Sequence, residues 1–389
     1  MPKRHICFFS GKRGGFNHLI PVIEAVRAEP DMDASIIVAD MHLAGAFGHT
    51  VDEVRRYLPP DRVHEVETLM GSDSKVARVK SLGVGILGQA DLLHRLAPDF
   101  LVVLGDRLEI LAPVLTALQL NIPVAHLFGG DLTQGGVDEV VRHAVTKMAA
   151  LHFAATEQSA ERIRRMGEEP WRVHAVGSPA LDLIRQGRYT PADEVRRKFS
   201  LDPDRPVVLL LQHSVTWQVD RAGAQIQATL DALDTSNRDD IQVVAVQPCS
   251  DPGYSEVVRA LEAAAASRPR FQLHKNIDGP DFWGLMALAA VLVGNSSAGP
   301  LETASFHLPC INIGIRQQDR LRADNVLDVD HDAAAIAAAL DTALADDAFL
   351  ARVRACVSPY GDGRAAGRIL DVLRDAPTDG SLIRKKMTY

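Results

Sequence analysis

Several side chains able to do acid–base chemistry lie close together in one stretch of the sequence, residues 101–143. They are three acids, an arginine and a histidine: Asp106, Asp131, Asp138, Arg142 and His143. One carboxylate can remove a proton from a substrate, a second acid can return one, and a cation can stabilise the charge that develops. The set therefore indicates a functional site, although these residue types alone do not name a reaction.

Two apolar runs and two helical patterns place these side chains. The run Leu101–Leu104 predicts a strand, a helix-period run follows over Leu108–Leu120, and a second strand is predicted over Ile122–Phe128. A polar loop then leads to a helix that begins at Asp138. This order predicts a parallel βαβ unit, in which ligands bind beyond the carboxyl ends of the strands. The acids that follow the two strands are therefore expected on one rim with Asp138.

Each acid, taken singly, also has a structural interpretation. An Asp after a strand is often the N-cap of the next helix, and Asp138 in a first helical turn suits the helix dipole. Asp138 and Arg142 are also spaced as an ordinary i, i+4 ion pair. The functional interpretation is favoured because several such side chains are expected on the same rim.

A glycine-rich turn follows the first predicted strand, His5–Ser10. The turn Gly11-Lys12-Arg13-Gly14-Gly15 precedes a helix predicted from near Asn17, and such a turn lets backbone N–H groups approach an anion. Arg13 is placed to reach a phosphate, and the alternative is a tight turn with a solvated basic residue. The turn is neither a dinucleotide-binding fingerprint nor a P-loop.

A second constellation, Gly294–Glu302, has the sequence GNSSAGPLE. A strand ends, small polar residues turn and a helix starts, so helix N–H groups, two hydroxyls and the helix dipole favour an anion. Ser296 and Ser297 are predicted to bind phosphate, an ordinary N-cap being the alternative, and Glu302 is expected to reach sugar hydroxyls. His213 follows an apolar strand and is expected to face the same site, although a lone histidine at a strand end is often structural.

Composition indicates an ordinary globular protein of two domains. The chain has 389 residues and a formal net charge of -8, which argues against a nucleic-acid partner. No apolar run is long enough to span a membrane and the N-terminus does not have the pattern of a signal peptide, so a cytoplasmic protein without a membrane partner is expected. Four scattered cysteines have no metal-ligand spacing and suit a reducing compartment: Cys7, Cys249, Cys310 and Cys356.

The predicted fold class is α/β, with two doubly wound Rossmann-like domains that face a cleft. Residues 1–185 form the first domain, the proline-bearing stretch 186–205 a linker, and residues 206–362 the second domain. Residues 363–389 are expected to form a C-terminal helix and tail that pack back on the first domain. The other predicted strands are Ala34–Val38, Leu151–Ala155, Val173–Val176, Pro206–Gln212, Ile241–Gln247, Phe271–His274, Ala290–Gly294 and Pro309–Ile313.

These motifs together resemble the hydrolysing branch of the UDP-N-acetylglucosamine 2-epimerase family. The segments that carry the resemblance are GDRLE (Gly105–Glu109), NIPVAHLFGGD (Asn121–Asp131), DEVVRHAVTKMAALHF (Asp138–Phe153), VGNSSAGPLE (Val293–Glu302), INIGIRQQDRLRADNVLDV (Ile311–Val329) and PYGDG (Pro359–Gly363). The resemblance covers nearly the whole chain. It implies a two-domain GT-B-like fold, with UDP held mainly by the C-terminal domain.

The resemblance also implies roles for single residues. Those expected to act in catalysis are Asp106, Asp131 and Asp138 as acid/base carboxylates, supported by Arg142, His143 and His213. Those expected to contact UDP are Arg13, Gly14, Asn295, Ser296, Ser297 and Glu302. No metal or other cofactor is implied, and the expected partners are a UDP-sugar and a second copy of the chain in a homodimer.

Three segments depart from the pattern usual in the family. The first loop has Gly15 where an acid is usual, Phe128 replaces a histidine, and Asp131 replaces a glutamate. Ser214-Val215-Thr216 also stands where Pro-Glu-Thr usually follows His213. These changes bear on which sugar is accepted and on whether water is admitted.

The reaction that the resemblance implies inverts C2 of UDP-N-acetylglucosamine. UDP leaves C1 as a base takes the C2 proton, which gives a 2-acetamidoglucal, and a second acid returns a proton from the other face. Water then gives N-acetylmannosamine plus UDP. The alternatives are a non-hydrolysing epimerase that returns UDP-N-acetylmannosamine, a GT-B glycosyltransferase, and a catalytically silent nucleotide-sugar binding protein.

Overall fold

The computed structural model describes residues 3–235 and 240–389. The chain divides into two compact units. Unit 1 contains Met1–Asp131, Asp138–Gln186 and Tyr360–Tyr389, and unit 2 contains Leu132–Val137 and Gly187–Pro359. The loop between Asp131 and Asp138 thus belongs to unit 2, while both acids belong to unit 1.

Unit 1 is built on a parallel sheet of seven strands among its described residues, in the order β3-β2-β1-β4-β5-β6-β7. The strands are β1 (Arg4–Ser10), β2 (Met32–Ala39), β3 (Val63–Val66), β4 (Phe100–Leu104), β5 (Val124–Leu127), β6 (Leu151–Ala154) and β7 (Val173–Ala175). Most are continuous buried runs, as expected for parallel strands covered on both faces. The order changes direction between β1 and β4, and the carboxyl ends of strands at such a point are the usual ligand site of an open α/β sheet.

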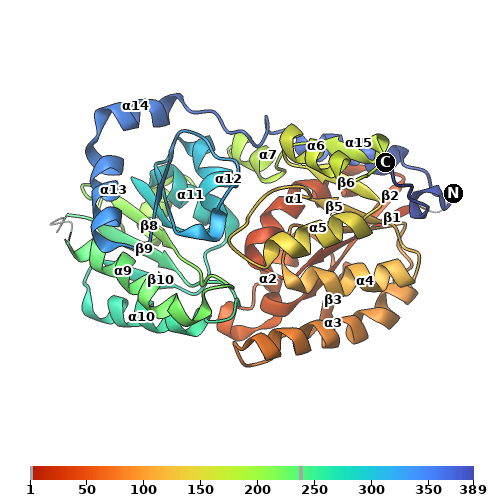
Figure 1. The fold of residues 1–389 in the computed structure, drawn as a ribbon, viewed down its shortest axis with the longest axis horizontal. Helices are drawn as coiled ribbons and strands as arrows, with labels where there is room; N and C mark the ends of the chain where they lie inside the picture. Colours follow the sequence, from red (N-terminus) through yellow and green to blue (C-terminus); the bar gives the residue numbers. More distant parts are fainter. Residues whose placement is uncertain (1–2, 236–239) are drawn as a thin grey trace. The chain divides into compact units, whose positions relative to one another are not determined.

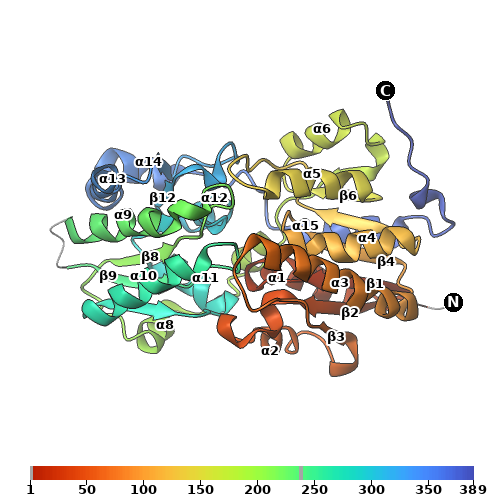
Figure 2. The same ribbon diagram turned by 60° about the horizontal axis from the view of Figure 1, so that its bottom comes forward.

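Helices cover both faces of this sheet (Figure 1). They are α1 (Arg13–Ala28), α2 (Val51–Val54), α3 (Lys75–Leu96), α4 (Leu111–Gln119), α5 (Asp138–Met148), α6 (Glu157–Arg165), α7 (Ala180–Arg185) and α15 (Ala365–Asp375). Helices α3, α4 and α5 lie side by side (Figure 2), and α1 packs against α7 and α15. Because right-handed crossovers change face when the strand order reverses, these two groups cover opposite faces.

Unit 2 has a second parallel sheet, of six strands in its described part, in the order β10-β9-β8-β11-β12-β13. The strands are β8 (Val207–Leu211), β9 (Gln242–Val246), β10 (Phe271–His274), β11 (Val291–Gly294), β12 (Cys310–Ile313) and β13 (Val326–Val329). The helices are α8 (Ala192–Lys198), α9 (Ala222–Thr235), α10 (Tyr254–Ser267), α11 (Gly279–Leu288), α12 (Ala298–Glu302), α13 (Ala333–Ala345) and α14 (Asp347–Ala355). Val208 and Leu210 of β8 share a buried core with Ile226 of α9 and Ile336 of α13.

The α/β prediction with two parallel sheets is confirmed, and the structure corrects several details. Two of the four edge strands, β3 and β13, were not predicted, because a charged residue, Glu65 in one and Asp328 in the other, interrupts each short apolar run. Helix α1 begins at Arg13 rather than near Asn17, so Gly14 and Gly15 lie in its first turn. The stretch predicted as a linker, 186–205, contains helix α8.

The C-terminal segment is tied into unit 1 by Asp182 of α7. The carboxylate of this buried residue accepts hydrogen bonds from the main-chain N–H groups of Ala365, at 2.9 Å, and Ala366, at 2.8 Å. These are donors of the first turn of α15 that have no partner within the helix. Asp182 therefore caps α15 from a distant part of the chain. None of the helices in the described residues is long and apolar enough to cross a membrane.

We predict that Asp182→Ala destabilises unit 1 by about 1–3 kcal/mol, because the substitution leaves two buried N–H donors unpaired. Asp182→Asn should lose less, because one acceptor oxygen remains. Thermal unfolding followed by circular dichroism measures the effect. Asp371→Ala on the exposed side of α15 is the control and should stay within about 0.5 kcal/mol of wild type. Equal losses in the Asp182 and Asp371 variants would show that the cap contributes nothing specific.

Candidate active site

Arg142 is the centre of the polar cluster in unit 1. Its side chain extends from α5 and has no exposed surface. One guanidinium nitrogen, Nη2, donates to the carboxylate of Asp106, and the other, Nη1, donates to the main-chain carbonyl of Asp131 at 3.0 Å and to Oε2 of Glu139 at 2.7 Å. The structure thus brings together the residues that follow β4 and β5 with the start of α5.

The charges around Arg142 decide its ionisation. Burial alone would lower the pKa of its guanidinium, but the nearby Asp106, Asp131 and Glu139 raise it. The guanidinium therefore stays charged and faces carboxylates from three segments of unit 1. A buried cation of this kind holds the Asp106 carboxylate in its ionised form at a fixed place.

His126 of β5 holds the turn that carries Asp106, through a hydrogen bond to the residue before it. The ring Nε2 of His126 donates to the carbonyl of Gly105 at 2.7 Å, and Gly105 has φ +84°. His126 is fully buried, and burial lowers its pKa to about 3. A neutral imidazole therefore fixes the backbone immediately before Asp106, a supporting role that the sequence did not reveal.

The other predicted residues of unit 1 are placed as follows. Asp131 is buried, Asp138 is the first residue of α5 and is half-buried, and His143 donates from Nε2 to Oε1 of Glu139 at 3.0 Å. Phe128 has φ +65° and packs edge-on against the ring of His18, with ring centroids 5.1 Å apart. The position at which the family usually has a histidine is therefore part of an apolar contact.

The glycines that follow β1 differ in the space around them. A Cβ atom added at Gly15 would lie 3.3 Å from Cδ2 of Leu104, so a larger residue there would require the Leu104 side chain to shift slightly. Gly11 lies directly over Glu109, because an added Cβ would come within 2.5 Å of its Cγ. Arg13 is half-buried, and Gly14 is exposed with nothing within 4 Å of an added Cβ.

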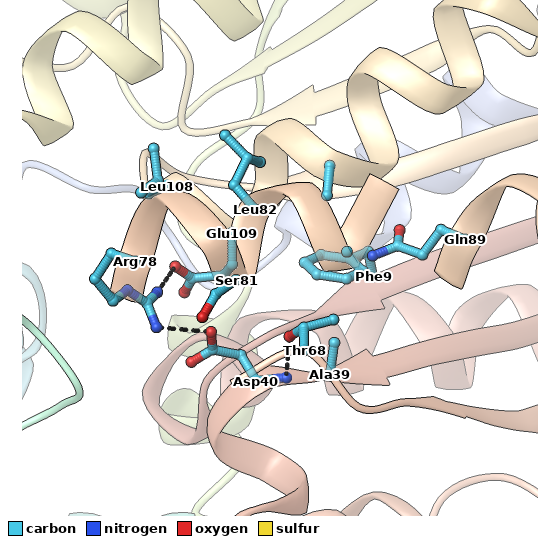
Figure 3. Close-up of a pocket in the computed structure, with 12 residues that line it drawn as sticks. Phe9, Ala39, Asp40, Thr68, Arg78, Ser81, Leu82, Gln89, Leu108 and Glu109 are labelled. Atoms are coloured by element: carbon cyan, nitrogen blue, oxygen red, sulfur yellow. Dashed lines mark hydrogen bonds and ion pairs between the residues drawn. The ribbon is translucent and has the colours of Figure 1, made fainter. Parts of the chain in front are cut away.

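A buried network of charges supports this loop. Arg78 of α3 lies between two carboxylates, at 2.8 Å from Asp40 and 3.1 Å from Glu109, and all three line a small cavity (Figure 3). Arg107 lies 3.5 Å from the other oxygen of Glu109. Burial raises the pKa of the Asp40 carboxyl to about 6, and the charge of Glu109 adds to the effect. The cavity of about 10 Å³ has room for about one water molecule, so this network supports the loop and is not a sugar pocket.

In unit 2, Asn295 and His213 hold each other in place. The Asn295 side chain accepts from the N–H of His213 at 2.7 Å and donates to its carbonyl at 2.9 Å. The Nδ1 atom of His213 accepts from the main-chain N–H of Cys249 at 3.1 Å, so the proton of the neutral ring is on Nε2. These contacts bring the carboxyl ends of β8, β9 and β11 together at one point.

The predicted anion-binding turn follows β11. Gly294, with φ +136°, is required there because an added Cβ would lie 2.0 Å from the carbonyl oxygen of Leu211. The hydroxyl of Ser296 accepts from the N–H of Ala298 at 3.4 Å, whereas the side chain of Ser297 makes no capping bond. Helix α12 has only five residues. Phosphate binding at this turn stays a prediction, as does the alternative of a plain cap.

Glu302 differs from its expected setting. Its side chain is buried, and Oε2 accepts from Nε1 of Trp283 at 2.6 Å. Burial raises the pKa of this carboxyl to about 7, although the indole hydrogen bond acts in the opposite direction. A contact between Glu302 and sugar hydroxyls stays a prediction.

Sequence inspection missed two further groups at these sites. Glu139 bridges Arg142 and His143, and the sequence gives no sign of this role because an acid in a first helical turn is ordinary. Arg316 donates from Nη1 to the Asn295 carbonyl at 3.1 Å, and its Nη2 lies 3.7 Å from Asp251. Arg316 lies in Ile311–Val329, one of the segments that carry the family resemblance, and this was the only sign of it in the sequence. The described residues contain no group of three or more His, Cys, Asp or Glu arranged to hold a metal ion.

Comparisons with known proteins agree on one family. Residues 24–374 match the family described as UDP-N-acetylglucosamine 2-epimerase. The chain is 34% identical to the UDP-N,N'-diacetylbacillosamine 2-epimerase (hydrolyzing) of Legionella pneumophila, over 99% of this chain and 100% of that protein.

Two solved structures show the fold. The UDP-N-acetylglucosamine 2-epimerase of Neisseria meningitidis, solved bound to UDP-N-acetylglucosamine, has a TM-score of 0.80 at 18% identity and covers 95% of this chain and 99% of that one. A calicheamicin glycosyltransferase has a TM-score of 0.54 at 15% identity and covers 97% of this chain and 100% of that one. The fold is therefore GT-B-like, as predicted.

The burial of His126 predicts a loss of stability in acid. Its folded pKa of about 3 lies below the ordinary value of about 6.5, so the unfolded chain binds the proton more strongly. The stabilisation is complete above about pH 6.5 and is lost as the pH falls towards 3, by at most about 1.4 kcal/mol per pH unit. His126→Gln keeps an N–H donor without a titrating ring and should flatten this dependence in urea unfolding measured from pH 7 to 4.

His94→Gln, at an exposed position on α3, is the control for that experiment. If the His126 and His94 variants show the same pH dependence, His126 does not stay neutral in the folded protein.

Proposed function

The chain belongs to the UDP-N-acetylglucosamine 2-epimerase family and is a 2-epimerase of UDP-sugars, and on that premise we propose that it is a hydrolysing enzyme. It would eliminate UDP from a UDP-linked 2-acetamido sugar, invert C2 and release the free 2-epimer. The hydrolyzing relative from Legionella pneumophila supports release of the free sugar, and the observation that carries the acid–base part is the contact of one buried cation, Arg142, with the Asp106 carboxylate and the Asp131 carbonyl. That arrangement supports two acids acting on one substrate.

The reaction runs through loss of UDP because the C2 proton of the sugar is not acidic enough to be removed by itself. A base takes that proton as the C1–O bond breaks, which leaves a 2-acetamidoglucal and places positive charge on the ring during bond breaking. Carboxylates nearby stabilise this oxocarbenium character. A second acid then protonates C2 from the opposite face, and water adds at C1 to give the free sugar. We assign these acid–base roles to Asp106, Asp131 and Asp138.

We assign the nucleotide to unit 2. The mutual hold of His213 and Asn295 and the turn Ser296-Ser297 support a site for the diphosphate, with Glu302 for the ribose. Departure of a diphosphate needs cations, and Arg13 of the loop after β1 is proposed to supply one. His143 and Arg142 complete the catalytic set.

For the substrate we propose UDP-N,N'-diacetylbacillosamine ahead of UDP-N-acetylglucosamine. The hydrolyzing relative from Legionella pneumophila, at 34% identity over its full length, supports this choice. UDP-N-acetylglucosamine is the second candidate, since it is bound in the structure from Neisseria meningitidis.

The product identifies the reaction. With each UDP-sugar in turn, we expect one equivalent of UDP and one of the free 2-epimeric sugar by NMR, and at least tenfold higher kcat/KM for the diacetylbacillosamine derivative. A product that remains attached to UDP would show a non-hydrolysing epimerase. Transfer of the sugar to an added acceptor, without change at C2, would show a glycosyltransferase.

We expect Asp106→Asn and Asp138→Asn each to lower kcat by about two or more orders of magnitude, because an amide can neither accept nor donate the proton. The fold should persist in the Asp106 variant, since Arg142 keeps Glu139 and the Asp131 carbonyl as partners. Activity is therefore normalised to folded protein measured by circular dichroism. Asp91→Asn, exposed on α3, is the control. A fall in activity that only matches the loss of folded protein would make these acids structural caps.

A further inference from the structure

Glu139 makes two contacts with residues assigned to the site. On α5 its carboxylate accepts from Arg142, three residues later, through Oε2 at 2.7 Å, and from His143, four residues later, through Oε1 at 3.0 Å. The side chain of Glu139 is 15% exposed and that of Arg142 is fully buried. Both carboxylate oxygens are thus used by two different polar side chains of one helical turn.

A cluster with the same spacing on the surface of unit 1 shows how little such contacts hold a side chain when solvent reaches them. Glu161 of α6 lies 3.6 Å from Arg164 and 3.0 Å from Arg165, again three and four residues later. Glu161 is 48% exposed and Arg165 is 78% exposed, so solvent screens these pairs and their contribution is small. Glu139 has the same spacing, but its partner Arg142 is buried, so solvent does not compete for the contact and the guanidinium keeps one orientation.

The contact of Glu139 with Arg142 also affects the orientation of Asp106. The guanidinium is a rigid planar fork, so fixing Nη1 against Glu139 also fixes the direction of Nη2, which donates to the Asp106 carboxylate. Without Glu139, Arg142 would keep the Asp131 carbonyl on Nη1 and the Asp106 carboxylate on Nη2, but it would lose the charged partner that holds Nη1. The Asp106 carboxylate would then lose its defined orientation.

Glu139 acts in the same way on His143. Donation from Nε2 to Glu139 places the proton of the neutral ring on Nε2 and leaves Nδ1 as an acceptor. Nδ1 is buried and has no hydrogen-bond partner among the residues that the structure describes.

We propose that Glu139 is a positioning residue of the acid–base site, which orients Arg142 against Asp106 and holds the His143 ring proton on Nε2. The proposal rests on the proposed function in one respect, the acid–base role of Asp106. Glu139 is expected to act through its neighbours and not to contact the sugar.

Steady-state kinetics with the UDP-sugar that the wild type turns over tests the effect on catalysis. Glu139→Gln should lower kcat about 10–100-fold, because a small misplacement of a reacting group has an effect of that size. KM, and the affinity for UDP measured by calorimetry, should stay within threefold. Glu139→Ala should lose more than Glu139→Gln, which keeps one acceptor oxygen. Glu161→Gln is the matched control and should retain wild-type kcat.

Two kinetic results would overturn the proposal. A kcat within threefold of wild type in Glu139→Ala would show that Arg142 needs no such support. A kcat that falls only in proportion to folded protein, or a rise in KM that accounts for the loss, would make Glu139 a structural residue or a substrate contact.

A measurement that needs no turnover tests the same proposal. Nitrogen-15 NMR of histidine-labelled protein at a pH of about 8.5, where a free imidazole is neutral, reports which ring nitrogen carries the proton. The His143 signal, identified by its loss in His143→Gln, should show the proton on Nε2 in the wild type and a mixture in Glu139→Ala. A proton on Nδ1 in the wild type, or no change in Glu139→Ala, would contradict the proposal. Failure of the wild type to turn over either UDP-sugar would contradict the proposed function and leave this result to decide the role of Glu139.

Discussion

The site in unit 1 depends on the burial of one guanidinium. Arg142 has no exposed surface, so its charge must be balanced by groups that the fold brings to it. Removing one partner of such a buried pair typically costs about 3–5 kcal/mol, which ties the end of β4, the end of β5 and the first turn of α5 to a single geometry. The same constraint keeps Asp106 at a defined place while leaving it partly accessible.

The surroundings of this cation are rigid for separate reasons. His126 remains neutral because it is buried, and it holds the turn before Asp106 through the Gly105 carbonyl. The buried ion pair of Arg78 with Glu109 supports the loop after β1, because Gly11 of that loop packs on the Glu109 side chain. In unit 2 a neutral group holds the main chain instead, since the Asn295 amide hydrogen-bonds to the N–H and the carbonyl of His213. In each case a polar side chain fixes the backbone at the carboxyl end of a strand.

Sequence patterns predicted the parts of the fold that depend on burial. The central strands are apolar runs because helices cover both faces, and the family resemblance was correct because its motifs follow one another along nearly the whole chain. The edge strands β3 and β13 escaped prediction because a charged residue interrupts each short apolar run, whereas the other two edge strands, β7 and β10, were predicted.

The site could be predicted only as a set of residues, since their contacts depend on the folded chain. The pairing of Arg142 with Asp106 joins positions 36 residues apart, and no local pattern states it. The spacing of Glu139 relative to Arg142 is the same as that of Glu161 to Arg164, yet one pair is buried and the other is exposed. Both helices pack against the sheet, and the two cases differ in whether the paired side chains lie on the buried or the exposed side of the helix.

The most direct test of the account is the fate of the C2 proton. Turnover of the UDP-sugar in D₂O, followed by NMR of the product, should give a free sugar with inverted configuration and one deuterium at C2, because the proton that a carboxylate removes is replaced from solvent. A sugar that retains hydrogen at C2 would contradict acid–base chemistry at that carbon, and with it the roles assigned to Arg142 and the acids around it.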